Sequence, residues 1–176
     1  METSMSKDEL QGELKTIELL LEKCYKAMDE IKNGNIIDFK ETVDSLYIES
    51  VNTTAGTVDS FVKNVIIHLF KLKYGLMIDS YDSLKDEIDN FRDAVDDLVD
   101  WYGDRNKNVL NRVNLAKSYR MAVRQFQRIL DHPTKGKEYT NVSTKTFPEI
   151  CPWPLNGIME YPIERLLNIW DDSFKK

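Results

Sequence analysis

The sequence predicts an all-α fold: a single-domain helical bundle of five main helices, followed by an extended proline-rich segment and a short C-terminal helix. Three observations support this class. The 176 residues contain only 7 Gly and 5 Pro, too few for a sandwich or barrel with a turn about every ten residues. Hydrophobic residues make up 41% of the chain, enough for a core that needs no disulfide or structural metal. Apolar residues recur at alternating steps of four and three, the period of one helix face.

The first predicted helix covers residues 6–33, after a flexible start at residues 1–5. Ser6 is the expected N-cap, Glu9 is its capping-box partner, and Gly34 is the expected stop. One apolar stripe runs along this helix, formed by Leu10, Leu14, Ile17, Leu21, Cys24, Met28 and Ile31. Such a seam suits either a helical bundle or a coiled-coil dimer.

The next two helices are predicted on either side of a break. Asp38 is the expected cap of the second helix, and residues 52–56 (NTTAG) are expected to break or kink the chain because they are weak helix formers. The third helix covers residues 57–75 and is apolar nearly all round. A helix of that kind is expected in the middle of the fold.

The fourth and fifth helices are predicted to form an antiparallel hairpin. Ser80 is the expected cap of the fourth helix and Gly103 its end. The fifth helix is expected over residues 106–130, and Pro133 closes it. The short link at Gly103 brings the two helices side by side.

Beyond the fifth helix, residues 134–146 are polar and are predicted to form an exposed loop. Prolines exclude a helix from residues 147–154, and the large apolar residues of this segment suggest that it is pinned onto the bundle. A short turn is expected at residues 155–159, and an extension helix at residues 162–176. The residues assigned to this structural motif are Phe147, Pro148, Cys151, Pro152 and Trp153.

Charge is divided between two neighbouring segments. In residues 79–104 acidic side chains far outnumber Lys85 and Arg92, whereas residues 105–137 are basic apart from Asp131. The candidate basic face consists of Arg112, Arg120, Arg124 and Arg128. We expect the acidic and basic faces to neutralise each other. The alternative is a basic ridge for RNA, DNA or an acidic partner, although the net charge of −6 argues against general nucleic-acid binding.

Candidate chemistry is sparse. His68 is the titratable residue of interest in the apolar third helix, and Lys71 lies one turn further on. We expect His68 to be a core residue bonded to a carboxylate, with Glu49 a conceivable partner; the alternative is a site formed with Lys71 and Tyr119. No sequence pattern points to a catalytic residue, a metal or a cofactor, so a non-enzymatic role is expected.

The compartment is predicted from the termini and the cysteines. Residues 1–7 lack the basic and apolar regions of a signal peptide, and the longest apolar run, residues 65–70, is far shorter than a membrane span. Cys24 and Cys151 are expected to be reduced thiols, Cys151 as a buried and inert one. These observations predict a cytoplasmic protein with no membrane partner.

Three segments resemble motifs of the domain of unknown function 29 family. They are residues 48–50 (IES), 67–74 (IHLFKLKY) and 147–153 (FPEICPW), similar to the family's EIES, LHLLKWxY and FPxxCPW. Tyr119 and Ala122 fit a looser YxxA pattern, and the resemblance covers residues 19–159. The chain departs from the family at Leu72, where the family has Trp, and after Ser80, where the family often has Trp-Arg.

The resemblance implies a helical fold in a prokaryotic, cytosolic protein, and it implies no activity. Two functions from different classes are therefore open. The first is a protein-interaction or self-association module, with an unknown protein or a second copy as partner. The alternative is a nucleic-acid-binding protein, such as a ribonuclease or a toxin–antitoxin component, that uses the basic face.

Overall fold

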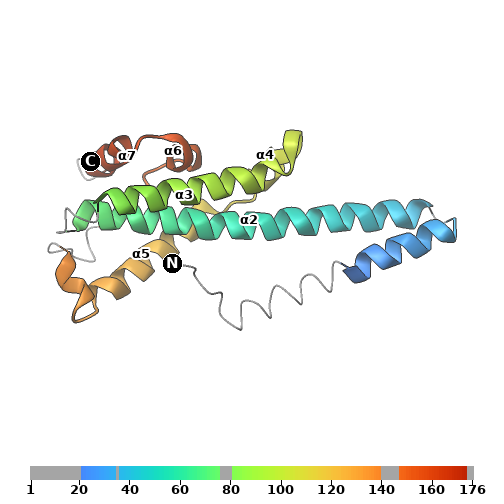
Figure 1. Ribbon diagram of the computed structural model, residues 1–176, viewed down its shortest axis with the longest axis horizontal. Coiled ribbons are helices and arrows are strands. Elements are labelled where there is room, and N and C mark those ends of the chain that lie inside the picture. Colours follow the sequence, from blue (N-terminus) through green and yellow to red (C-terminus); the bar gives the residue numbers. More distant parts are fainter. Residues whose placement is uncertain (1–20, 35, 76–80, 140–146, 174–176) are drawn as a thin grey trace. The chain divides into compact units, whose positions relative to one another are not determined.

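A computed structural model describes residues 21–34, 36–75, 81–139 and 147–173 (Figure 1). These residues form helices without a β-strand, so the predicted all-α class is confirmed. The contacts of the chain fall into two compact units, Met1–Thr53 (unit 1) and Thr54–Lys176 (unit 2). That residues 1–176 form a single domain therefore remains a prediction.

Unit 1 contains a helix over residues 21–32 and the beginning of helix α2. Gly34 follows the first helix with a φ of 73°, a left-handed conformation in which glycine is the least strained residue. Asp38 lies in the first turn of α2, which begins at Ile36, rather than at the N-cap. The predicted cap Ser6 and the first part of the apolar stripe lie outside the described residues.

Helix α2 spans Ile36–Tyr74 without interruption, so the predicted break at residues 52–56 is wrong. Buried residues at steps of four and three continue through the segment: Val51, Ala55, Val58 and Val62. Burial of this stripe outweighs the weak helix propensity of the Asn, Thr and Gly residues between them. The two predicted helices are therefore one.

In unit 2, α3 spans Tyr81–Asp100 and is followed by a short 3-10 helix, Gly103–Arg105, which begins with a glycine at a φ of 50°. The prediction of one fifth helix is wrong, because the structure has two helices there, α4 (Asn106–Leu110) and α5 (Leu115–Leu130). The predicted cap Ser80 lies outside the described residues.

Asn114 explains the division between α4 and α5. Its side-chain oxygen accepts a hydrogen bond from the backbone N–H of Lys117 and caps α5. Its own backbone N–H donates to the carboxylate of Asp59 on α2, over 2.7 Å. An N-cap of this kind competes with the helical conformation, and the contact with α2 holds the turn in place.

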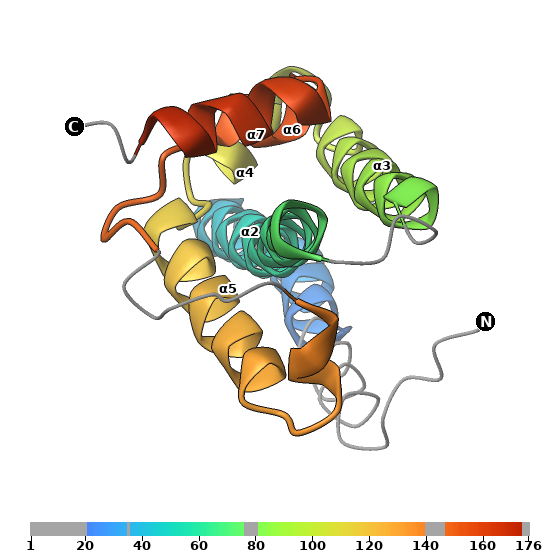
Figure 2. The same cartoon turned by 90° about the vertical axis from the view of Figure 1, so that its left-hand side faces the viewer.

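Within unit 2, α3 and α5 lie on different sides of α2, and α6 and α7 cover a further side (Figure 2). The expected antiparallel hairpin of the acidic and basic helices is therefore not formed. The turn between α4 and α5 redirects the chain, so that α5 packs on α2 instead of on α3.

The C-terminal part of unit 2 is helical on both sides of the proline-rich segment. A 3-10 helix, Lys135–Glu138, lies in the predicted exposed loop and is followed by an isolated antiparallel bridge between Tyr139 and Gly75. The rest of that loop, 140–146, is outside the described residues. The predicted turn at 155–159 is helix α6 (Leu155–Glu160), and the last helix is α7 (Ile163–Asp172).

The core of unit 2 is an aromatic cluster around Phe70 of α2. The ring centroid of Phe70 lies 5.0 Å from that of Phe147, 5.2 Å from Trp170 and 6.1 Å from Trp153. The cluster therefore joins α2 to the proline-rich segment and to α7. None of the described helices is both long enough and apolar enough to cross a bilayer.

Candidate functional site

His68 is buried on α2, and both of its ring nitrogens are engaged. Nδ1 donates to the carbonyl oxygen of Asn64 over 2.7 Å, and Nε2 lies 2.5 Å from a carboxyl oxygen of Glu87 on α3. Because a carbonyl can only accept, Nδ1 is the donor to Asn64, and Nε2 contacts the carboxyl group of Glu87. The pair links α2 to α3 and presents no free base.

The four candidates for a polar site do not form one site. Among the described residues, no hydrogen bond or ion pair joins any two of Glu49, His68, Lys71 and Tyr119. Glu49 pairs with Lys23 within unit 1, so the carboxylate partner of His68 is Glu87 rather than Glu49. The hydroxyl of Tyr119 donates to the carbonyl of Pro148 over 2.9 Å.

The basic face is exposed along α5. Arg120, Arg124 and Arg128 point away from the core, and no ion pair between α5 and α3 occurs in the described parts of these helices. Arg112 lies in the turn before α5 and is also exposed. The expected neutralisation of the acidic helix by α5 is therefore absent.

The acidic face of α3 crowds several carboxylates around Asp96, and Arg92 on the same helix pairs with Asp89. Burial raises the pKa of Asp96, and the neighbouring carboxylates, chiefly Asp100, Asp93 and Asp97, raise it further. Like charges that lie close together on one helix face disfavour the ionised form of each carboxyl group. This electrostatic pattern agrees with the separation of α3 from α5.

Arg92 is a structural residue that the sequence analysis missed. From α3 its Nε donates to the carbonyl of Ile158 over 2.9 Å, and its Nη2 donates to the carbonyl of Tyr161 over 2.8 Å. These carbonyls lie at the C-terminal end of α6, where helix carbonyls lack partners of their own. The one available signal was that Arg92 is one of two basic residues, with Lys85, on a strongly acidic helix.

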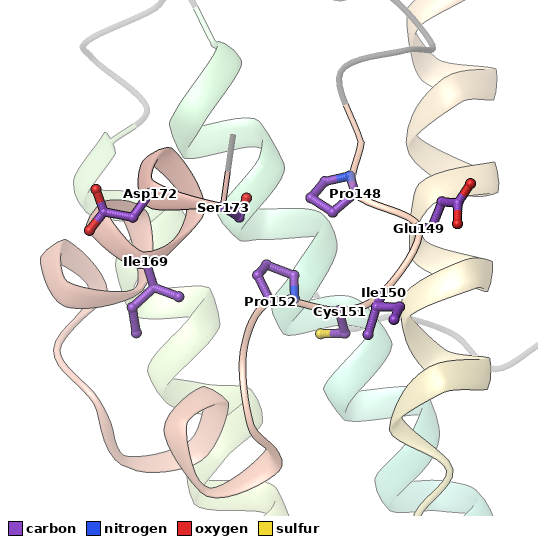
Figure 3. A pocket seen from close by; sticks show the side chains of 8 residues that line it. All are labelled: Pro148, Glu149, Ile150, Cys151, Pro152, Ile169, Asp172 and Ser173. Carbon is purple, nitrogen blue, oxygen red and sulfur yellow. The ribbon is translucent and has the colours of Figure 1, made fainter. Parts of the chain in front are cut away.

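An open pocket of about 610 Å³ lies between the proline-rich segment and α7 (Figure 3). Pro148, Pro152 and Ile150 line one side of it, and Ile169 lines the other. The Glu149 carboxylate turns away from this pocket, toward α5 (Figure 3). The lining is thus mainly apolar, with Asp172 and Ser173 as polar residues at the end of α7.

Cys151 also lines this pocket, and its environment opposes reactivity. Burial raises the pKa of the Cys151 thiol to about 11, and the thiol donates a weak hydrogen bond to the carbonyl of Trp153. Only the thiolate is a good nucleophile or metal ligand. Cys151 therefore remains a neutral thiol near pH 7.

Unit 1 carries an exposed apolar stripe on its first helix. The stripe consists of Leu21, Cys24, Tyr25, Met28 and Ile31. Four of these residues, all except Cys24, have between 51% and 67% of their surface exposed. The residues expected to face a core or a coiled-coil partner thus face solvent in the single chain.

Within residues 21–32, the opposite side of that helix contacts α2 through one buried alanine and polar pairs. Ala27 is buried, Lys23 pairs with Glu49, and the Thr42 hydroxyl donates to Glu30 over 3.0 Å. The helix therefore uses its polar face for the intrachain contact and leaves its apolar face uncovered.

No metal site is found in the described parts of the chain, where His, Cys, Asp and Glu side chains do not gather in groups of three or more. A family model described as "Domain of unknown function DUF29" matches residues 15–162. No curated protein and no solved structure matches the chain. The matched range includes the three segments that carry the resemblance, and it ends just before α7.

Proposed function

The chain belongs to the domain of unknown function 29 family, and from this premise we propose that it is a non-enzymatic module that associates with a second copy of itself. The observation that carries the proposal is the exposed apolar stripe of unit 1. The binding surface is the helix over residues 21–32.

The spacing of the stripe supports a helical partner. Leu21, Cys24, Met28 and Ile31 continue a pattern of fours and threes that begins at Leu10 in the sequence. This is the heptad pattern with which helices pack against one another as knobs into holes. A second copy presents the same stripe, so a two-fold contact buries both.

The charges beside the stripe permit such a contact. Glu22 and Asp29 are acidic, and Lys26 and Lys32 are basic. These two acidic and two basic side chains cancel, so the flanks of two copies do not repel each other through a net charge. Burial of a Leu or Met side chain contributes about 1.5–3 kcal/mol, which several stripe residues supply together.

We expect light scattering to show that the full chain forms a dimer. The substitution Met28→Glu should weaken the dimer about a hundredfold, because it buries a carboxylate without a partner in the contact. The matched control is Lys40→Gln, which also lowers the net charge by one but lies exposed on α2, outside the stripe. A wild-type chain that stays monomeric over the concentration series would refute the proposal, as would equal effects of the two variants.

Nucleic-acid binding through the basic face is the second candidate. The supporting observation is that Arg120, Arg124 and Arg128 are exposed on one face of α5 without an ion pair in the described chain. Fluorescence anisotropy with a single-stranded RNA and a duplex DNA at low salt tests it. Binding that falls with salt and is lost when all three arginines become Ala is the expected result; negligible affinity at low salt eliminates this function.

A further inference from the structure

A groove of about 280 Å³ runs between α5 and the start of the proline-rich segment. Arg120, Val123 and Arg124 form its α5 wall, and Phe147, Pro148 and Glu149 form the other. The groove lies in unit 2 and shares no residue with the apolar stripe of unit 1. Binding of a ligand in this groove is therefore independent of the self-association proposed above.

Two guanidinium groups on one wall carry uncompensated positive charge. Arg120 and Arg124 are exposed, lie one helical turn apart, and have no acidic partner among the described residues. Glu149 turns toward α5 but forms no ion pair with either arginine (Figure 3). Arginine binds carboxylates strongly because its planar donors match both oxygens.

The rest of the groove is mainly apolar, with the polar side chains of Gln127 and Glu149 also lining it. Val123, Phe147 and Pro148 are each half-buried and leave part of their surface to the groove. Glu149 is exposed at the rim and accepts N–H donors. A ligand that fits must therefore combine carboxylates, an apolar group and free N–H groups.

We propose that this groove binds a short, extended, acidic segment of a partner protein. Residues one turn apart on a helix have their Cβ atoms about 5–6 Å apart. In an extended peptide, alternate side chains lie on the same side and about 6.6 Å apart. Acidic residues two positions apart thus face Arg120 and Arg124, and the apolar residue between them faces Phe147 and Pro148.

The groove favours such a peptide over a nucleic acid. Glu149 at the rim accepts backbone N–H donors, which a phosphate backbone lacks, and the net charge of −6 opposes a long polyanion more strongly than a peptide with two carboxylates. The groove also ends before Arg128, which is not among its lining residues. A nucleic acid that follows the basic face would engage Arg128 as well, whereas the peptide would not.

The test is an NMR titration of the full chain with acetyl-Glu-Leu-Glu-amide. We expect shifts on α5 and on residues 147–149, and about tenfold weaker binding by Arg124→Gln, since a charge-assisted hydrogen bond is lost. The matched control is Arg128→Gln, one turn further along the same helix face, which should leave the affinity unchanged. The peptides acetyl-Gln-Leu-Gln-amide and acetyl-Glu-Gly-Glu-amide should both bind more weakly.

Three results would overturn the proposal. One is a peptide that causes no shifts on the groove. Another is an equal loss of affinity in Arg124→Gln and Arg128→Gln. The third is an oligothymidine that binds more tightly than the peptide and depends on Arg128 as strongly as on Arg124. Because Arg120, Arg124 and Arg128 are exposed, none of these outcomes depends on whether a variant folds.

Discussion

Replacing Trp153 by Ala should lower the free energy of unfolding by about 3–5 kcal/mol. Trp153 is 2% exposed, stacks on Trp170 with ring centroids 5.1 Å apart, and donates from Nε1 to the carbonyl of Leu166 over 2.8 Å. The substitution removes a large buried ring and leaves that carbonyl without its donor. Both losses come from the contact between the proline-rich segment and α7.

Urea denaturation followed by circular dichroism measures this effect. Ile150→Ala is the matched control, because Ile150 belongs to the same segment but is 80% exposed; its effect should stay within about 0.5 kcal/mol. Trp153→Phe, which keeps a buried ring but loses the N–H donor, should fall between the two. A loss for Trp153→Ala no larger than that of the control would show that the segment does not anchor the core.

The second large effect is expected for Arg92→Ala, which should lower the free energy of unfolding by about 2–4 kcal/mol. The side chain of Arg92 is 12% exposed, and its two hydrogen bonds to the end of α6 are made by a charged donor. Burial lowers the pKa of Arg92, and the nearby Asp89 offsets part of this shift. Removal of the guanidinium leaves the carbonyls of Ile158 and Tyr161 without their donor.

Two further variants separate geometry from charge at this position. Arg92→Lys keeps the charge, but a single ammonium cannot reproduce the two-pronged contact, so we expect it to recover only part of the loss. Lys85→Ala removes another link between α3 and the C-terminal helices, the ion pair with Glu164 over 2.6 Å. That pair lies in solvent and its removal should change stability little. Equal losses for Arg92→Ala and Lys85→Ala would contradict the assigned role.

Features that depend on local sequence were predicted well. The stripes of α3 and α7 follow from helical spacing, and Gly34 and Gly103 end helices at positions where the backbone has a positive φ. Prolines excluded a helix from the segment before α6. Each of these features is set by residues only a few positions apart, where propensity and steric limits dominate.

Features that depend on distant contacts were not predictable in the same way. The continuity of α2 through residues 52–56 depends on burial of its stripe, and the turn before α5 depends on a contact between Asn114 and Asp59. The pairing of His68 with Glu87 depends on the relative register of two helices. Spacing within one helix carries no information on that register.

The two thiols are chemically distinct, which provides a selective chemical probe. Cys24 is exposed, whereas the Cys151 thiol remains protonated at neutral pH because burial raises its pKa to about 11. A maleimide dye should therefore attach to Cys24 alone in the folded protein at concentrations low enough to keep the chain monomeric. Delayed labelling at Cys151 would instead time the transient opening of the aromatic core.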